Sequence, residues 1–348
     1  MVEFWLCALA LIISLQNVLS MRVVGLSGAK LIDESVDILI PMRNEESNVE
    51  GCLKPLLNSE LLAASKIYVL DDGSTDETRA LINQFKVEKL QGSDLPSGWL
   101  GKNWACHNLA KAGNGEYLVF VDADVRLHPY AIASAITKME ALNWSFISPY
   151  PKQLSGSIIE KLIQPLLQWS WIASVPLRIA ESFPNRSMTI ANGQFFLIKR
   201  SAYEQTGGHQ AISGEVLDDL ELARVLIAKG FRGGVADGSS VASCRMYRNG
   251  AELIDGYTKS LWKAFGGVGG TLAATFLLLI TGILPFLNFG AATLFIVLSR
   301  VLSAMKTKSN PAYALLHPFA ILFLLYLILL SQVRKSRGTL QWRGRSIA

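Results

Sequence analysis

The sequence predicts an α/β fold built on a mostly parallel sheet, with apolar helices at both ends of the chain. Strands and helices alternate between residues 36 and 121, which is typical of a parallel sheet covered by helices on both faces. Two of these strands end in carboxylates, at Asp71 and at Asp122. Apolar residues gather at the N-terminus and in the last quarter, whereas the middle of the chain is polar. The chain therefore combines an α/β core with candidate membrane helices.

Composition favours a membrane protein over a nucleic-acid-binding one. Half of the 348 residues are hydrophobic, only 18% are charged, and the mean hydropathy is +0.30. Much of the net charge of +5 lies in the C-terminal tail, which fits membrane orientation. No stripe of lysine and arginine interleaved with aromatic residues is present, so we expect no nucleic acid partner.

The cysteines and histidines show no disulfide or metal-binding spacing. The four cysteines lie far apart, which predicts unpaired thiols in a reducing compartment. We expect each of the four histidines to be a structural or surface residue rather than a metal ligand.

The N-terminal segment, residues 1–21, is predicted to be a transmembrane helix. Its apolar run over residues 4–20 has about the minimum length that spans a bilayer. A signal peptide is the alternative, but the stretch before this run carries Glu3 and no basic residue. Arg22 and Lys30 follow the helix, so the positive-inside rule places the next domain in the cytoplasm.

The first predicted strand, Val36–Ile40, ends at Pro41. Asn44 and Glu45 follow it and precede a predicted helix over residues 47–58. Polar groups at the carboxyl end of a parallel strand line the crevice in which a nucleotide binds. A simple helix-capping turn is the alternative.

The second predicted strand, Ile67–Leu70, ends in two adjacent acids, Asp71 and Asp72. A carboxylate at this place can accept a hydrogen bond from a uracil ring or a ribose hydroxyl. Ser74 or Thr75 is expected to cap the following helix, over residues 76–85. A capped turn explains that part of the motif, but it does not explain two adjacent acids.

A glycine and a lysine open the helix predicted over residues 102–112, after a third strand at residues 87–90. Gly101-Lys102 resembles half of a P-loop, but Asn103 stands where that motif has serine or threonine. The segment is therefore not a Walker site. A lysine at a helix N-terminus can still approach a diphosphate.

The run Tyr117–Val121 predicts a fully buried strand that ends in Asp122-Ala-Asp124. Two carboxylates spaced in this way suit a hard divalent cation, Mg²⁺ or Mn²⁺, that also holds phosphates. We expect Asp124 to be the direct metal ligand and Asp122 to face the ribose or the outer shell of the metal. An acidic turn after a strand is the alternative.

A second acidic pair, Asp218-Asp219, begins the helix predicted over residues 217–229, downstream of a strand at residues 189–199. An acid at this place can act as a general base toward an acceptor. Favourable charge at the helix N-terminus is the alternative. Residues 155–183 are predicted to be helical, as either an interfacial segment or a buried helix pair.

The C-terminal part is predicted to enter the membrane. An amphipathic interfacial segment, 236–270, leads into membrane helices over 271–331 and a basic tail, 332–348. Residues 271–298 form either one kinked helix or two short helices around a turn at 285–289. A cytoplasmic basic tail and an outside N-terminus require an odd number of spans, so we expect three; four spans would place the tail outside.

Together these motifs resemble the family 2 inverting glycosyltransferases over about residues 35–235. The resemblance implies the GT-A fold, a Rossmann-like domain that binds a nucleotide sugar. It implies that Asp71 and Asp72 contact the nucleoside and that the D-x-D motif holds the metal and the diphosphate. The family's base is the second acid of a Glu-Asp pair; here the pair is Asp218-Asp219, so Asp219 is the expected base and Asp218 the reserve. The Q-x-x-R-W motif of processive members is absent.

Further motifs resemble the carotenoid glycosyltransferases of the diaponeurosporenoate type and the related hopanoid-associated enzymes. These motifs are Gly98–Lys102, Gly193-Gln194-Phe195-Phe196, Leu217–Asp219, Met246-Tyr247 and Trp342–Arg345. The resemblance implies a nucleotide sugar as donor and a polyisoprenoid in the membrane as acceptor. The expected substrate-binding residues are Pro41, Asn44, Glu45, Asp71, Asp72, Lys102, Asp122, Gly193 and Gln194.

The sequence thus predicts an integral, multi-pass enzyme of the cell membrane with a cytoplasmic catalytic domain. It transfers a sugar, expected to be glucose from a UDP-sugar, to a carotenoid or other polyisoprenoid acceptor. Two alternatives are a sugar transferase that acts on polyprenyl phosphate and a non-catalytic membrane protein that keeps a nucleotide-binding fold. A transporter is disfavoured because the predicted spans carry few charged residues.

Overall fold

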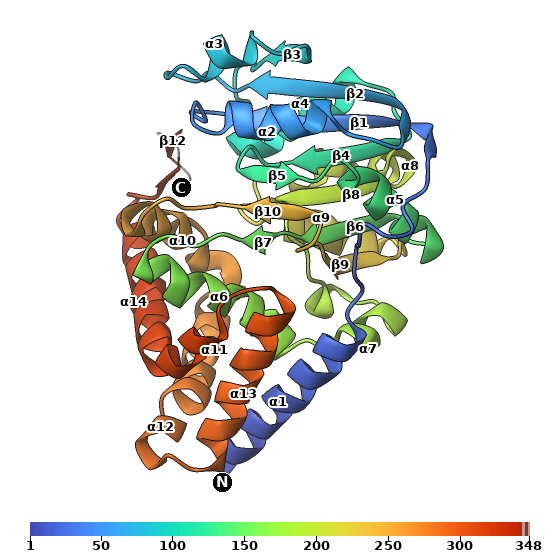
Figure 1. Ribbon diagram of the computed structural model, residues 1–348. Coiled ribbons are helices and arrows are strands. Elements are labelled where there is room, and N and C mark those ends of the chain that lie inside the picture. The colour runs from blue at the N-terminus through green and yellow to red at the C-terminus, as the bar shows by residue number, and fades with distance from the viewer. Residues whose placement is uncertain (343–344, 347–348) are drawn as a thin grey trace. The chain divides into compact units, whose positions relative to one another are not determined.

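The computed structural model describes residues 1–342 and 345–346, and the chain divides into two compact units (Figure 1). An α/β unit holds residues 22–152 and 179–245, and a helical unit holds residues 1–21, 153–178 and the chain from residue 246 onward. Sequence reasoning placed residues 35–235 in one catalytic domain. In the structure, residues 153–178 group with the helical unit instead, because their apolar faces pack on other helices there. The tail motif Trp342–Arg345 includes residues 343–344, which lie outside the described residues.

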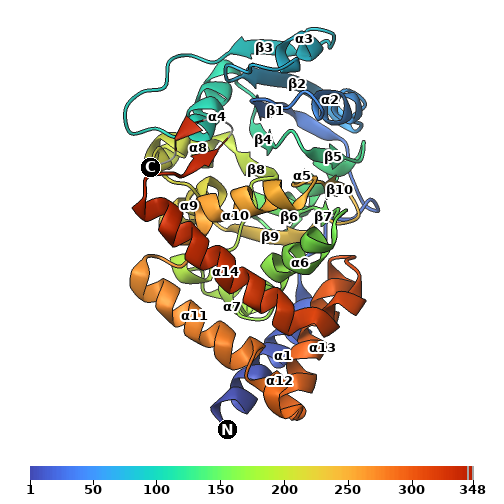
Figure 2. The same ribbon diagram turned by 90° about the vertical axis from the view of Figure 1, so that its left-hand side faces the viewer.

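A seven-stranded sheet forms the centre of the α/β unit (Figures 1 and 2). Its order is β3-β2-β1-β4-β8-β6-β9. The strands are β1 (Ile32–Met42), β2 (Leu62–Asp71), β3 (Glu88–Gln91), β4 (Tyr117–Val121), β6 (Phe146–Tyr150), β8 (Phe195–Lys199) and β9 (Gly233–Asp237). All neighbours are parallel except β8, which is antiparallel to both β4 and β6. The predicted mostly parallel sheet is confirmed.

The register of the sheet brings the polar ends of three strands to one edge. β1 is parallel to β2, with Met42 opposite Asp71, and parallel to β4, with Leu39 opposite Phe120. Residues 36–40 of β1, 68–71 of β2 and all of β4 are buried, and apart from Asp37 and Asp71 they are aliphatic or aromatic, as in a sheet covered on both faces. The polar groups that follow Met42, Asp71 and Phe120 therefore gather at the carboxyl edge.

Helices of the α/β unit cover the sheet and carry the remaining site residues. They are α2 (Val49–Leu57), α3 (Thr78–Ile82), α4 (Gly101–Ala112), α5 (Ala131–Ala141), α7 (Leu177–Ser182), η1 (Arg186–Met188), α8 (Arg200–Gln205), η2 (Gly208–Ile212) and α9 (Asp218–Ala228). Apolar residues of α4, α8 and α9 share one buried cluster with β1, β4 and β8. Short strands β5 (Val125–Leu127), β10 (Ala242–Cys244) and β7 (Lys152–Gln153) form a second, three-stranded sheet.

Two local predictions need correction. The strand predicted over residues 189–199 begins only at Phe195, because a 3₁₀ turn and a loop precede it. The helix predicted over residues 76–85 is the short α3, whose N-cap is Glu77 and has no side-chain cap bond. The predicted cap, Ser74, instead accepts a hydrogen bond from the backbone N–H of Asn44. The tertiary contact between the two loops thus replaces the local cap.

The helical unit contains every predicted membrane segment. Its elements are α1 (Val2–Ser20), α6 (Ile158–Ile172), α10 (Gly250–Ala264), α11 (Val268–Gly282), α12 (Pro285–Asn288), α13 (Ala291–Lys306), η3 (Pro311–Leu316), α14 (His317–Ser336) and the strands β11 (Gln341–Trp342) and β12 (Arg345–Ser346). α1 lies beside α13, and α12 lies at the same end of the unit as the N-terminus (Figure 1). α11 runs beside α14 (Figure 2).

The chain reverses between α11 and α13, which decides between the two interpretations of residues 271–298. Pro285 opens the short α12, and Phe289 adopts a left-handed conformation with φ 45° that ends it. Two helices around a turn are therefore present rather than one kinked helix. Among the described residues, three helical segments are long and apolar enough to cross a membrane: 2–20, 268–288 and 311–336.

All four cysteines are buried and unpaired, as the sequence predicted. They are Cys7, Cys52, Cys106 and Cys244.

A buried ion pair fixes the start of the sheet and leads to a stability prediction. Asp37 accepts hydrogen bonds from Arg200 Nη2 (2.8 Å) and from the backbone N–H of Gly115 (2.7 Å). Removing one partner of a buried pair leaves an uncompensated charge, so Asp37→Ala should lower the unfolding free energy by about 3–5 kcal/mol. Thermal unfolding in detergent should show a fall in Tm of roughly 5–10 °C. Glu50→Ala, which removes an exposed pair with Lys54, should leave Tm unchanged; equal shifts would contradict the prediction.

Candidate active site

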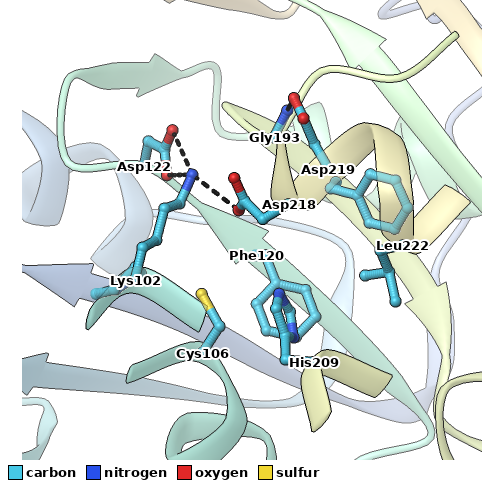
Figure 3. A pocket seen from close by; sticks show the side chains of 11 residues that line it. Lys102, Cys106, Phe120, Asp122, Gly193, His209, Asp218, Asp219 and Leu222 are labelled. Carbon is cyan, nitrogen blue, oxygen red and sulfur yellow. Dashed lines mark hydrogen bonds and ion pairs between the residues drawn. The ribbon is translucent and has the colours of Figure 1, made fainter. Parts of the chain in front are cut away.

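A pocket opens at the carboxyl edge of the sheet, between the first turns of α4 and α9 (Figure 3). Six of the sequence-predicted site residues line it: Pro41, Lys102, Asp122, Gly193, Asp218 and Asp219. Five further residues line it that sequence reasoning did not select: Cys106, Phe120, Phe196, His209 and Leu222. The pocket therefore has one wall of charged groups and one of apolar and aromatic groups.

Lys102 joins the two acidic motifs of the chain. Its Nζ lies 3.0 Å from Asp122 Oδ1 and 3.2 Å from Asp218 Oδ2, and both contacts are drawn in Figure 3. Asp122 follows β4 and Asp218 begins α9, so residues far apart in the sequence meet at one ammonium group. Burial alone would lower the pKa of Lys102, but the charges of Asp122 and Asp218 hold it well above its ordinary value. The lysine is therefore a fixed cation.

Asp219 lies next to this group but makes different contacts. Its Oδ2 accepts from the backbone N–H of Gly193 (2.6 Å), and its Oδ1 accepts from the N–H of Leu220 (2.7 Å). Burial, reinforced by the charge of Asp218, raises its pKa to about 6. An ionised carboxylate offers about four lone-pair positions. Two backbone donors therefore leave Asp219 able to accept a further proton or hydrogen bond.

Gly193 is a glycine because Asp219 approaches its backbone closely. A Cβ placed on Gly193 would lie 3.1 Å from Asp219 Cβ and 3.4 Å from Lys102 Nζ. The first of these distances is tighter than ordinary van der Waals contact, so a side chain here would displace the aspartate. Close approach of the two segments is thus a requirement of the site.

Gln194 acts in the structure through its backbone. Its carbonyl accepts a hydrogen bond from the N–H of Asp122 (3.1 Å), and its own N–H donates to Asn192 Oδ1 (2.9 Å). The segment that holds Asp219 therefore also holds Asp122. Gln194 does not line the pocket among the described residues, although sequence reasoning expected it to contact the substrate.

Asp124 does not line the pocket, but its chemistry fits a metal ligand. Its Oδ1 is buried and has no hydrogen-bond partner among the described residues, and the Cys244 thiol bonds to its carboxylate. Burial, with the charge of Asp122, raises its pKa to about 6. Residues 1–342 and 345–346 contain no group of three or more His, Cys, Asp or Glu side chains placed to hold a metal. Asp124 and Asp122 could therefore supply two oxygen ligands, and the other ligands would have to be phosphate or water.

The four acids and amides predicted to contact the nucleotide lie in two loops that are bonded to each other. The N–H of Thr75 donates to Asn44 Oδ1 (2.8 Å), and the N–H of Glu45 donates to Thr78 Oγ1 (2.7 Å). Asp71 Oδ1 accepts from the N–H of Ser74 (3.1 Å). These contacts place Asn44, Glu45, Asp71 and Asp72 at the ends of β1 and β2, beside the pocket rather than in its lining.

The apolar wall could have been found in part from strand periodicity. Side chains two residues apart in a strand point to the same face, so Phe120 lies on the face of Asp122. Phe196 lies opposite Phe120 in the antiparallel register. His209 packs on Phe120 with ring centroids 4.9 Å apart, and burial lowers its pKa to about 4. No sequence signal identifies His209, because its place depends on a 3₁₀ turn of the tertiary structure.

Asn103 is a further residue that sequence reasoning did not select. Its buried side-chain amide donates to the backbone carbonyls of Ile212 (2.8 Å), Ser213 (3.0 Å) and Glu215 (3.0 Å). These carbonyls belong to the loop that leads into α9. Asn103 therefore ties the helix of Lys102 to the loop that presents the second acidic pair.

Comparison with known families identifies the class of this domain. Residues 37–207 match the model of "Glycosyl transferase family 2". These residues therefore form a family 2 glycosyltransferase domain.

Two curated relatives are 4,4'-diaponeurosporenoate glycosyltransferases. The protein of Staphylococcus aureus strain MRSA252 is 24% identical over 254 residues, which cover 72% of this chain and 66% of that protein. The protein of Staphylococcus haemolyticus strain JCSC1435 is 25% identical over 237 residues, which cover 66% of this chain and 61% of that protein. This chain thus spans less than two thirds of the length of these relatives.

A solved structure shares the fold over nearly the whole chain. It is the mannosyltransferase PcManGT from Pyrobaculum calidifontis in complex with GDP-Man and Mn²⁺. Its TM-score is 0.53 at 17% identity, and the match covers 95% of this chain and 99% of that chain. The predicted GT-A fold, with apolar helices at the N- and C-terminal ends, is therefore confirmed.

The close approach at Gly193 gives a testable substitution. Gly193→Ala should displace Asp219 by a few tenths of an ångström and reduce kcat/KM for sugar transfer about tenfold, which is about 1.4 kcal/mol of transition-state stabilisation. Steady-state kinetics on the purified protein would measure this. Gly234→Ala is the control, because a Cβ there meets only Trp144 at 4.0 Å. Equal kinetics for the two variants would show that the contact has no role in catalysis.

Proposed function

We propose that this protein is an inverting glycosyltransferase that transfers a sugar from a nucleotide diphosphate sugar to a lipid acceptor in the membrane. The observation that carries the proposal is the cluster of Asp122, Lys102 and Asp218 with Asp219 beside it, in a family 2 domain. One fixed cation and one adjacent base with a raised pKa are the groups that a single displacement at a sugar carbon needs.

Asp219 is the proposed general base. It takes the proton from the acceptor hydroxyl as that oxygen attacks the anomeric carbon, and the bond from this carbon to the diphosphate oxygen breaks. One displacement inverts the configuration. The position of Asp218 supports this assignment, because Asp218 is already paired with Lys102. Asp218 therefore holds the lysine, and Asp219 stays available for the proton.

Lys102 is proposed to stabilise the leaving nucleoside diphosphate. Its ammonium is the cation of the pocket wall that faces Asp122, and charge that develops on the diphosphate would be neutralised there. A divalent cation held by Asp124 and Asp122 would add Lewis-acid neutralisation of the same diphosphate. The Mn²⁺ in the PcManGT complex supports a divalent metal, either Mn²⁺ or Mg²⁺.

The donor and the acceptor are proposed from the relatives and from the helical unit. The name of the staphylococcal relatives points to a carotenoid acid, and the three apolar segments would keep a polyisoprenoid acceptor close to the enzyme. We propose UDP-glucose as donor, an integral multi-pass location in the cell membrane and a cytoplasmic catalytic unit. Membranes with and without the protein, incubated with UDP-glucose, should differ by a glucosylated lipid in mass spectra of the lipid extract. An unchanged lipid profile, with every tested nucleotide sugar, would contradict the proposal.

The raised pKa of Asp219 predicts that kcat/KM falls at acidic pH, which gives the pH profile an acid limb. The base is active when deprotonated, so kcat/KM should be retained above about pH 6 and should fall about tenfold per pH unit well below it. A pH series with the purified enzyme measures this limb. Glu221→Gln, on the same helix but paired with Arg224, should keep the limb. A flat profile between pH 5 and 7 would exclude Asp219 as the base.

Replacement of the base distinguishes two classes of acceptor. Asp219→Asn should lower kcat by about 10²–10⁴ if the acceptor group is a hydroxyl, because the proton then has no base. An acceptor carboxylate is already ionised and needs no base, so the variant would keep most of its activity. Single-turnover transfer to each class of acceptor lipid measures the difference. Loss of activity that accompanies a lowered Tm would be attributed to folding rather than to chemistry.

Asp124 is predicted to be required for metal-dependent binding of the donor. Asp124→Ala should remove the dependence of UDP binding on Mn²⁺ in titration calorimetry, because the expected direct carboxylate ligand is lost. Asp122→Asn should weaken binding less, since Asp122 is expected in the outer shell or at the ribose. Asp33→Ala, an exposed acid of β1, is the control. Loss of metal dependence in Asp122→Asn alone would reverse the assignment.

A further inference from the structure

The helical unit buries two basic side chains against one tryptophan. The guanidinium carbon of Arg300, in α13, lies 5.8 Å from the centre of the Trp169 ring, in α6. The ring of His317, the first residue of α14, lies 4.9 Å from the same indole in an edge-on arrangement. Arg300 is only 3% exposed and His317 is fully buried. Three helices of the unit therefore meet at a cluster of polar groups.

The nitrogens of this cluster have no partners among the described residues. Nε and Nη1 of Arg300 and both ring nitrogens of His317 are buried without a hydrogen bond. Trp169 differs, because its Nε1 donates to Ser299 Oγ (2.9 Å), which fixes the ring. An arginine keeps its charge in a protein, and burial of a charge without a partner is costly. Among the described residues the cluster thus offers hydrogen-bond donors and the positive charge of Arg300 without a negatively charged acceptor.

Three of the four acids in the helical unit's sequence have partners other than Arg300 in the described contacts. Glu160 accepts from Ser157 and Gly156 at the start of α6, and Glu252 accepts from Arg248 and Asn249. Asp255 pairs with Arg334 (2.7 Å). The one other acid in the unit's sequence is Glu3, in the first turn of α1. Among the described residues no acid is paired with Arg300, so a negative charge from outside the chain would compensate it.

The position of the cluster and its surroundings favour a lipid. His317 is the seventh residue of the apolar segment 311–336, within about two turns of its start, so it lies near the level where headgroups meet acyl chains. The N-terminus of α14 adds partial positive charge at the same place. Leu298, two residues before Arg300, and Phe319, two residues after His317, are 39% and 62% exposed. The same helices thus present apolar side chains outward and the polar groups of Arg300 and His317 inward.

We propose that Arg300 and His317, held around Trp169, form a binding site for the phosphate headgroup of an anionic membrane lipid. The lipid oxygens accept from Nε and Nη1 of Arg300 and from one ring N–H of His317. The acyl chains lie along the apolar faces of α13 and α14. The site is separate from the chemistry proposed above, and its test needs neither a sugar donor nor turnover.

The test measures how a matched pair of lipids stabilises the full chain. The protein is purified in dodecyl maltoside, and either phosphatidylglycerol or dioleoylglycerol is added; the second lipid has similar chains but no phosphate. Phosphatidylglycerol should raise the Tm of the wild type by roughly 5 °C, and dioleoylglycerol should not. Arg300→Gln should weaken the apparent affinity for phosphatidylglycerol about tenfold or more, because charge-assisted hydrogen bonds are lost. Arg334→Gln, a partly exposed arginine of the same unit that pairs with Asp255, should respond as the wild type does.

The baseline of the variant separates a binding role from a structural one. If the arginine serves the lipid, Arg300→Gln without lipid should be as stable as the wild type or more stable, since an uncompensated charge is removed. If Arg300→Gln does not fold, His317→Gln should show the same loss of the phosphatidylglycerol response. Equal stabilisation of wild type and variant, or none of either, would overturn the site. Equal protection by inorganic phosphate alone would overturn the lipid assignment and leave a site for a free anion.

Discussion

One ion-pair cluster, Lys102 with Asp122 and Asp218, is the constraint on which the α/β unit depends. The three residues come from α4, from the end of β4 and from the start of α9, so their contact requires the whole arrangement of sheet and helices to be correct. Two carboxylates brought this close would repel each other without a cation between them. The lysine therefore makes it possible to place acids from two distant motifs at one pocket.

Backbone contacts around this cluster then set different tasks for chemically identical groups. Asp218 and Asp219 are neighbours in the chain, but one is an ion-pair partner and the other accepts two backbone N–H bonds beside Gly193. Asp122 and Asp124 are divided in the same way, since only Asp122 touches Lys102 whereas Asp124 is bonded to the Cys244 thiol. The local environment rather than the residue type thus separates the aspartates that pair with Lys102 from those that do not.

Sequence patterns predicted the parts of this site that depend on local order and missed those that depend on distant contacts. The buried run 117–121 and the acids after it were predictable, because strand burial and the carboxyl-edge rule act locally. Asn103 and His209 were not predictable. The carbonyl of Ile212 that Asn103 contacts lies more than a hundred residues further along the chain, and His209 lies in a 3₁₀ segment that no periodicity marks. Ser74 was misassigned as a cap because the neighbouring loop at Asn44 competes for its hydroxyl. Apolar periodicity similarly indicated helices between residues 155 and 183 but could not show which unit they join.

In the helical unit, buried polar groups indicate a binding partner more specifically than apolar residues do. Leucines on α13 and α14 would suit any membrane helix, so their presence says only that the segment is apolar. A buried polar group inside such a helix needs a hydrogen-bond or ion-pair partner, because without one it destabilises the fold. Ser299 of α13 has such a partner, because its Oγ accepts a hydrogen bond from Trp169 Nε1. Nε and Nη1 of Arg300 have no hydrogen-bond partner among the described residues. Arg300 and His317 both pack against the indole ring of Trp169. An unsatisfied donor set that a fold retains in an apolar setting is most simply explained by an acceptor that arrives with the membrane.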